Sequence, residues 1–326
     1  MNPLSRLLSW ISPSAPVDPD TLAGLQRVVE VVDKVFAMTP GFDEKLAAPV
    51  GHARGYCASL IDVLPPPVDI GRPYFATDAL VHALFASADD IGDMLAASAP
   101  VRDYLAGPQS RQGDHFFALM AARRTERKVL GAAMQNGIMA TDVPQSLLQF
   151  SDRTLVLPAA DPETARDSLR AAAFDSLLRT FAGHIELARV AYTSLQSERE
   201  LERVRQRSRP ADSGVNFPSR YIAALDERLR QQFESLQPDA LVAELAAFLM
   251  RPEEALSLEP VQLWVTRAGV IQGENAREAG AASIRLTELT SRDRRRHVVL
   301  PVRIQCDEAR EALERSRETR ENMLLI

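Results

Sequence analysis

One long helical pattern constrains this sequence more than any other feature. Asp161 is placed to cap a helix, and Pro162 follows at the first helical position, where its fixed φ is already helical. The pattern continues to about Arg207, which corresponds to a helix of about 45 residues and nearly 70 Å at 1.5 Å per residue. After Gln196 most faces are polar. We therefore expect this end of the helix to project into solvent or to meet a partner.

Helical periodicity also dominates the rest of the first two-thirds of the chain. Apolar residues recur at spacings of three and four, and prolines or an Asn-Gly pair close the segments. We expect a small β-hairpin over residues 146–158, where two short apolar runs flank Ser151 and Asp152. The other predicted helices cover residues 21–38, 43–64, 77–105 and 114–135.

A different pattern follows a proline- and glycine-containing linker at residues 208–218. After two further helices, the apolar period changes to two, and Gly269 is placed for the left-handed position of a tight turn. The predicted fold class is thus mainly α. A helical domain, residues 1–207, precedes a small α+β domain, residues 219–326, with an antiparallel meander of three to four strands and a C-terminal helix.

Composition limits the classes of function. The net charge of −6 is unlike the basic excess of most nucleic-acid binders. No apolar run approaches the roughly 18 residues that span a bilayer, so we expect a soluble protein without a transmembrane segment. Cys57 and Cys306 lie far apart, which favours neither a disulfide framework nor a cysteine metal site and fits a reducing cytoplasm. The apolar Leu4–Ile11 patch has helical spacing, and whether it docks on a membrane or a partner stays open.

The candidate for metal chemistry is the pattern D-D-x-x-D at Asp89, Asp90 and Asp93. On a helix, Asp89 and Asp93 share one face and are able to share hard divalent cations. The pattern resembles the first aspartate-rich motif of the trans-isoprenyl diphosphate synthase and class I terpene synthase families. The resemblance implies a magnesium cofactor that neutralises a diphosphate leaving group.

The same stretch has a second interpretation as the start of a helix. Ser87 is placed to cap it, with Asp90 at the third position as in a capping box. On a helical wheel, Ile91 and Leu95 lie nearly opposite Asp89 and Asp93. The second metal motif that those families need is not found, and the pattern recurs only as a loose acidic copy at Asp307, Glu308 and Glu311. We therefore favour a capped helix whose acids face solvent. His82 shares the aspartate stripe and is expected to be partly exposed.

Two arginine clusters are candidates for binding an anion or an acidic partner. Neither is interleaved with aromatic residues, so nucleic acid is not the expected partner. The first cluster lies at the polar end of the long helix and the second in the turn before the last predicted strand. They comprise Arg199, Arg203 and Arg207, and Arg292, Arg294, Arg295 and Arg296.

The sequence contains no coherent set of catalytic residues. The first hypothesis is a non-enzymatic cytoplasmic interaction or regulatory protein, which contacts a protein partner or forms a homo-oligomer. The polar end of the long helix and the α+β domain are its expected surfaces. The alternatives are a magnesium-dependent helical enzyme acting on a diphosphate or nucleotide through the three aspartates, and an anion-binding or nucleic-acid-associated module using the arginine loop at residues 292–296.

Overall fold

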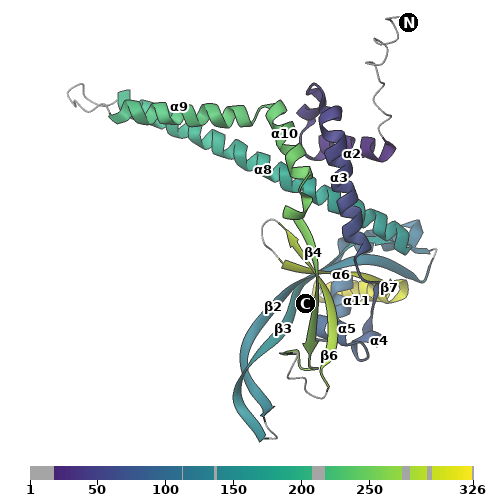
Figure 1. Cartoon of the computed structure of the whole chain (residues 1–326). Helices are drawn as coiled ribbons and strands as arrows, with labels where there is room; N and C mark the ends of the chain where they lie inside the picture. The colour runs from purple at the N-terminus through teal and green to yellow at the C-terminus, as the bar shows by residue number, and fades with distance from the viewer. Residues whose placement is uncertain are drawn as a thin grey trace, which may run out of the picture. The chain divides into compact units, whose positions relative to one another are not determined.

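A computed structural model describes residues 18–111, 113–135, 138–207, 217–273, 280–291 and 296–324 (Figure 1). The chain forms two compact units, each built from two separate stretches. Unit 1 comprises Met1–Cys57 and Ala173–Glu253, and unit 2 comprises Ala58–Ala172 and Glu254–Ile326. The division therefore falls within two helices, α3 (Phe42–Asp62) and α8 (Pro162–Arg207), whereas the predicted linker at 208–218 falls inside unit 1. Most of that linker lies outside the described residues.

Unit 1 is helical. Its core comes from apolar residues at spacings of three and four, such as Leu25 and Val28, or Leu241 and Leu245, which place one face of each helix inward. Phe36 and Phe181 are buried among them. Besides parts of α3 and α8, its helices are α2 (Pro19–Val31), the 3-10 helix η2 (Lys34–Met38), α9 (Phe217–Ser235) and α10 (Pro238–Leu249).

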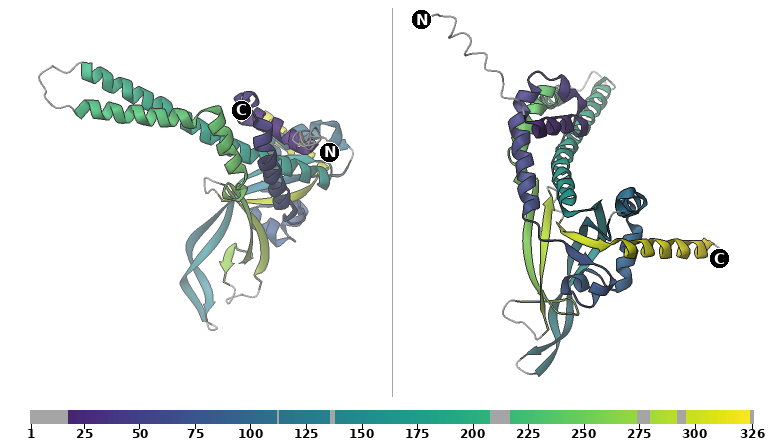
Figure 2. Two further views of the ribbon diagram at one scale, coloured as in Figure 1. Left: turned by 45° about the horizontal axis from the view of Figure 1, so that its top comes forward. Right: turned by 90° about the vertical axis from the view of Figure 1, so that its right-hand side faces the viewer.

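The long helix predicted from Asp161 is confirmed as α8, and Asp161 accepts hydrogen bonds from the amides of Glu163 and Thr164. Within unit 1, α8 and α9 run side by side in opposite directions, as Figure 1 and the left view of Figure 2 show. Residues nearer the end of α8 contact residues nearer the start of α9, as an antiparallel pair requires. The cross-helix contacts include Ala188–Gln232, Tyr192–Phe233 and Arg199–Asp226.

Unit 2 is built on a mixed sheet of seven strands in the described part of the chain, in the order β1-β7-β2-β3-β5-β4-β6. β6 also pairs with β7, so the six strands from β7 to β6 form a closed ring of paired strands. β1 is parallel to β7, and the other pairs are antiparallel. The strands are β1 (Val68–Ile70), β2 (His115–Gln135), β3 (Ile138–Ala159), β4 (Leu256–Val265), β5 (Val270–Gln272), β6 (Ala282–Ser291) and β7 (Arg296–Gln305).

The predicted fold class was wrong, because the chain is mixed α/β and its sheet is larger than a meander of three to four strands. Residues 114–135, predicted as a helix, form β2. Their alanine, leucine and arginine content favours helix, yet Phe116, Ala118, Met120 and Ala122 alternate inward and are buried. Pairing with β7 on one side and β3 on the other overrides the local propensity.

The small hairpin predicted at residues 146–158 is instead part of the single strand β3. The polar Ser151–Asp152 pair, interpreted as a turn, lies where the register between β2 and β3 shifts. Asp152 has a φ of 52°, which aspartate tolerates better than most residues. A β-bulge adds one residue and bends the strand without reversing it.

Short helices and α11 cover the sheet of unit 2. Ile91 and Leu95 of α6 are buried together with Ala309 and Ala312 of α11, and these residues belong to the same core as the inward side chains of the sheet. The helices are α4 (Arg72–Phe75), α5 (Ala79–Leu84), α6 (Ala88–Ala97), α7 (Ala99–Ala106), η3 (Pro108–Arg111) and α11 (Cys306–Leu324). Within the described ranges, no helix has the length and apolar character needed to cross a membrane.

The two cysteines are free and buried, Cys57 in unit 1 and Cys306 in unit 2. Burial raises the pKa of the Cys57 thiol to about 12, outweighing the opposite effect of Arg54. Burial also raises the pKa of Cys306. Because the thiolate is the reactive form, we expect Ellman's reagent to modify neither residue in the native protein at pH 8, and both in denaturant. Rapid modification of one native thiol would contradict this placement.

Candidate functional site

The aspartate motif lies at the start of α6, and the predicted helix start is confirmed. Ser87 is the N-cap: its hydroxyl accepts from the Asp90 amide at 3.2 Å and donates to the Asp90 carboxylate at 2.8 Å. The other oxygen of Asp90 accepts from the amide of Ala86 at 3.2 Å. Asp90 is therefore held by the local structure of the helix start.

Arginines accompany two of the three aspartates. Asp89 forms an ion pair with Arg72 at 2.8 Å, and Asp90 forms one with Arg153 at 3.4 Å. Asp93 is exposed, and Ile91 on the opposite side of the helix is buried. In the part of the chain that the structure describes, no three histidine, cysteine or acidic side chains come together as a metal site. The magnesium hypothesis stays a prediction.

Asp89 and Asp90 have different surroundings, so we expect their replacement by alanine to change the free energy of unfolding by different amounts. Asp90→Ala loses the cap interactions and the Arg153 ion pair, so we expect the free energy of unfolding to fall by about 1–2 kcal/mol. Asp89 is largely exposed, so Asp89→Ala should change it by less than about 0.5 kcal/mol. Urea denaturation measures both. Isothermal titration with MgCl2 tests the metal directly, and heat of binding that either substitution abolishes would favour the diphosphate-enzyme hypothesis.

The first arginine cluster pairs with the neighbouring helix. Arg199 and Arg203 lie 3.3 and 3.9 Å from the carboxylate of Asp226 in α9, and Arg207 is exposed at the end of α8. The first two thus contribute to the contact between α8 and α9. In the second cluster, Arg296 begins β7, whereas Arg292, Arg294 and Arg295 lie outside the described residues.

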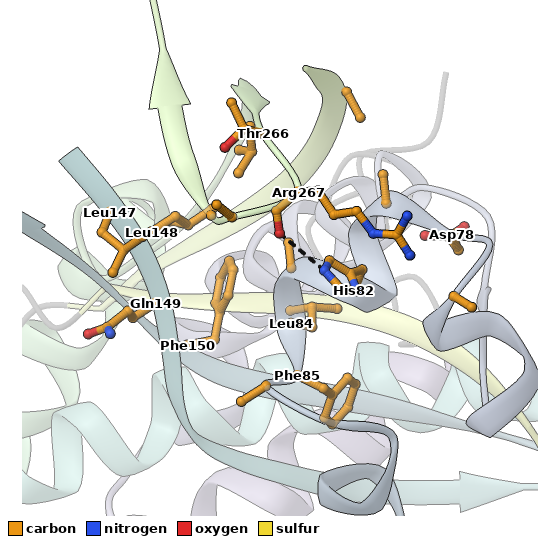
Figure 3. Close-up of a pocket in the computed structure, with 18 of the residues that line it drawn as sticks. Asp78, His82, Leu84, Phe85, Leu147, Leu148, Gln149, Phe150, Thr266 and Arg267 are labelled. Carbon is orange, nitrogen blue, oxygen red and sulfur yellow. Dashed lines mark hydrogen bonds between the residues drawn. The ribbon is translucent and has the colours of Figure 1, made fainter. Parts of the chain in front are cut away.

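A pocket that sequence reasoning missed lies in unit 2, with a volume of about 580 Å³ (Figure 3). Residues 76–79 and 82–86, in and around α5, line one side, and residues 147–151 of β3 line another. The turn between β4 and β5, residues 265–269, completes the wall together with Arg153 and the start of β6. The lining residues come from segments far apart in the sequence, so no local motif marks the pocket.

The pocket forms where β3 parts from β5. Their pairing is limited to Ser146 and Leu147, because β5 is short and the chain reverses at the turn Thr266–Gly269. The Gly269 amide donates to the carbonyl of Thr266, and its φ of 80° confirms the predicted left-handed position. Helix α5 packs into the opening, with Val81 and Leu84 buried against the core, and leaves the pocket beside the turn.

His82 joins the two sides of the pocket. Its Nδ1 lies 3.3 Å from the carbonyl oxygen of Phe75, and its Nε2 lies 3.2 Å from the carbonyl oxygen of Arg267, the contact drawn in Figure 3. A neutral imidazole has one N–H and donates to one of these carbonyls, whereas the imidazolium donates to both. The side chain is partly buried, as expected from the sequence. It connects the end of α4 to the turn that carries Arg267.

Arg153 and Asp78, two other charged residues of the wall, form hydrogen bonds with backbone groups. The Arg153 guanidinium donates to the carbonyls of Leu84 and Phe150 at 3.0 Å and stacks over the Phe85 ring, 5.1 Å from its centroid. Asp78 caps α5 by accepting from the amides of Leu80 and Val81 through one oxygen. These groups build the wall and keep α5 against β3.

We compared the chain with protein families, curated proteins and solved structures. No family model, curated protein or solved structure matches the chain.

Proposed function

We propose that the chain is an interaction protein that acts through protein–protein contact and self-associates through one face of α8. The face is a line of residues at alternating spacings of three and four, which we call the α8 stripe. It comprises Leu187, Val190, Ser194, Ser197, Leu201 and Val204.

The observation that carries the proposal is the exposure of the apolar members of this stripe. Leu187 is 71% exposed, Val190 58%, Leu201 52% and Val204 49%. Single exposed apolar residues are common on protein surfaces. Four in one line with the spacing of a coiled-coil seam are typical of a helix that packs against another helix.

The α8 stripe is separate from the contact between α8 and α9. Ala188, Tyr192 and Arg199 contact α9, and at about 100° per residue they lie roughly opposite the stripe. On the α9 side, Leu225 and Leu229 are buried. The hairpin of α8 and α9 is thus packed on its inner face, and the apolar side chains of the stripe lie exposed on the opposite face of α8.

A second copy of the chain is the occupant that we infer for the stripe. The spacings between successive residues of the stripe are 3, 4, 3, 4 and 3, which is the same order from either end of the helix. Two copies related by a two-fold axis are therefore able to pair their stripes in antiparallel orientation. Each Leu187 then meets the second copy's Val204, each Val190 meets Leu201, and the serines meet at the centre. Large side chains therefore face smaller ones along the seam.

The charges beside the stripe complement this pairing. Glu186 flanks its first residue and Arg207 follows its last, so antiparallel pairing brings the two together across the interface. Glu198 lies near the centre, where the same register places it opposite Thr193 of the second copy. Its carboxylate accepts a hydrogen bond from the Tyr221 hydroxyl of α9, which holds it on the α9 side of the helix.

Sedimentation equilibrium of the purified full chain tests the proposal. We expect the average molar mass to rise with concentration from that of one chain towards twice that value. An apolar seam gives a weaker dependence on salt than an interface built mainly from surface ion pairs. A single-chain mass at all concentrations up to about 100 µM, where a micromolar dimer is fully formed, would contradict the proposal.

A further inference from the structure

We propose that the pocket of unit 2 binds a small amphipathic monocarboxylate, with the carboxylate on Arg267 and the apolar part among Phe85, Leu147 and Phe150. All these residues belong to unit 2, whereas the α8 stripe belongs to unit 1. The inference therefore goes beyond the proposed self-association and does not depend on it.

The size and lining of the pocket fit a small organic ligand. Its volume of about 580 Å³ lies within the roughly 300–1,000 Å³ of small-molecule sites. The wall combines apolar and polar surface in similar amounts, and the Phe85, Leu148 and Phe150 side chains stand along its apolar part in Figure 3. Such sites combine apolar walls with a few placed polar groups that orient the ligand.

Arg267 supplies the charge for recognition. It is exposed on the pocket wall, and no hydrogen bond or ion pair of its guanidinium occurs within the ranges that the structure describes. The other charged or titratable side chains of the described wall are engaged: Arg153 with carbonyls and Asp90, His82 with two carbonyls, and Asp78 with the α5 amides. Among the described residues of the wall, Arg267 is therefore the cation that remains available for a ligand.

The turn that carries Arg267 is held in place before any ligand binds. His82 contacts the Arg267 carbonyl from one side, and the Leu148 amide donates to the Gly269 carbonyl at 2.8 Å from the other. A Cβ on Gly269 would lie 3.3 Å from the Leu147 side chain, so the turn packs closely on β3. Fixing the backbone that carries the recognition group reduces the entropy lost on binding, because only the Arg267 side chain remains to be ordered.

The charges favour a monoanion. A guanidinium matches the two oxygens of a carboxylate in a bidentate pair. Asp78 lies on the same wall, and in Figure 3 the Arg267 side chain extends towards it. Its negative charge would repel a phosphate dianion more strongly than a monocarboxylate, because the repulsion grows with the ligand charge.

The test uses 4-phenylbutyrate as the probe and 4-phenylbutyramide as its neutral match, with binding measured by isothermal titration calorimetry on the full chain. We expect the acid to bind and the amide to bind at least about tenfold more weakly. Arg267→Gln should weaken binding of the acid by about tenfold or more. Arg285→Gln, at an exposed position of β6, is the matched control and should leave binding unchanged.

A second variant tests the location without changing charge. Ala83 lines the pocket, so Ala83→Leu places extra carbon atoms in it and should abolish binding, while circular dichroism verifies that the variant is folded. Absence of binding to the wild-type chain would overturn the proposal. Equal affinity for acid and amide, or full affinity in Arg267→Gln, would also overturn it.

Discussion

The double variant Leu187→Glu, Leu201→Glu is expected to be monomeric, with a dissociation constant for the dimer at least about 100-fold higher than that of the wild type. Each substitution removes an apolar side chain from the proposed seam, and burial of a leucine contributes about 1.5–3 kcal/mol. It also places a carboxylate where desolvation is unfavourable. Since both leucines are more than half exposed in the single chain, its fold should be unaffected. Sedimentation equilibrium measures the change.

Leu22→Glu is the matched control, because Leu22 is an exposed leucine on α2 outside the stripe. It carries the same change of side chain and should leave the dimer intact. If the double variant associated as tightly as the wild type, α8 would not be the interface. If the control were equally monomeric, a general effect of added charge would explain the loss.

The second large effect is expected at the buried ion pair of unit 2. Glu288 in β6 is 4% exposed, and its carboxylate lies 2.9 Å from the Arg124 guanidinium of β2. The two atoms are close but not aligned as a hydrogen bond, so the contact is mainly Coulombic. After Glu288→Ala, Arg124 keeps the more exposed Glu126, 3.4 Å away, as a partner but loses its buried counter-charge, and we expect the free energy of unfolding to fall by about 3 kcal/mol.

Urea denaturation followed by circular dichroism measures this loss. Glu259→Ala is the control, because Glu259 is the exposed cross-strand neighbour of Glu288 and should contribute less than about 0.5 kcal/mol. Replacing both members of the pair, as in Arg124→Met with Glu288→Leu, should restore most of the lost stability. A double variant as unstable as Glu288→Ala would contradict the assignment of the cost to a charge that has lost its buried partner.

Local signals predicted the parts of the fold that local interactions determine. Asp161 and Pro162 mark the start of α8, Ser87 marks the start of α6, and Gly269 marks the turn between β4 and β5. In each case, the residue satisfies a backbone group or adopts a backbone angle that few other residues accept. Such constraints are visible within a few residues of sequence.

The large sheet depended on contacts that a local pattern does not contain. β2 consists largely of residues with good helix propensity, and it is a strand because β7 pairs with it from His115 and β3 from Phe117. Asp152 was interpreted as a turn residue, and the same tolerance of positive φ places it in a bulge. The pocket was missed for a related reason, since α5, β3 and the Thr266–Gly269 turn meet only in the folded unit.

Disulfide trapping measures the proposed pairing of α8 most directly. We expect a mixture of the Ser194→Cys and Ser197→Cys variants to form a covalent dimer on mild oxidation, linked between positions 194 and 197 in peptide mass spectrometry. Buried Cys57 and Cys306 should not compete. Gln196→Cys, at an exposed position on a different face of the same helical turn, should remain a single chain. Absence of the 194–197 link, or equal trapping through position 196, would contradict self-association through the α8 stripe.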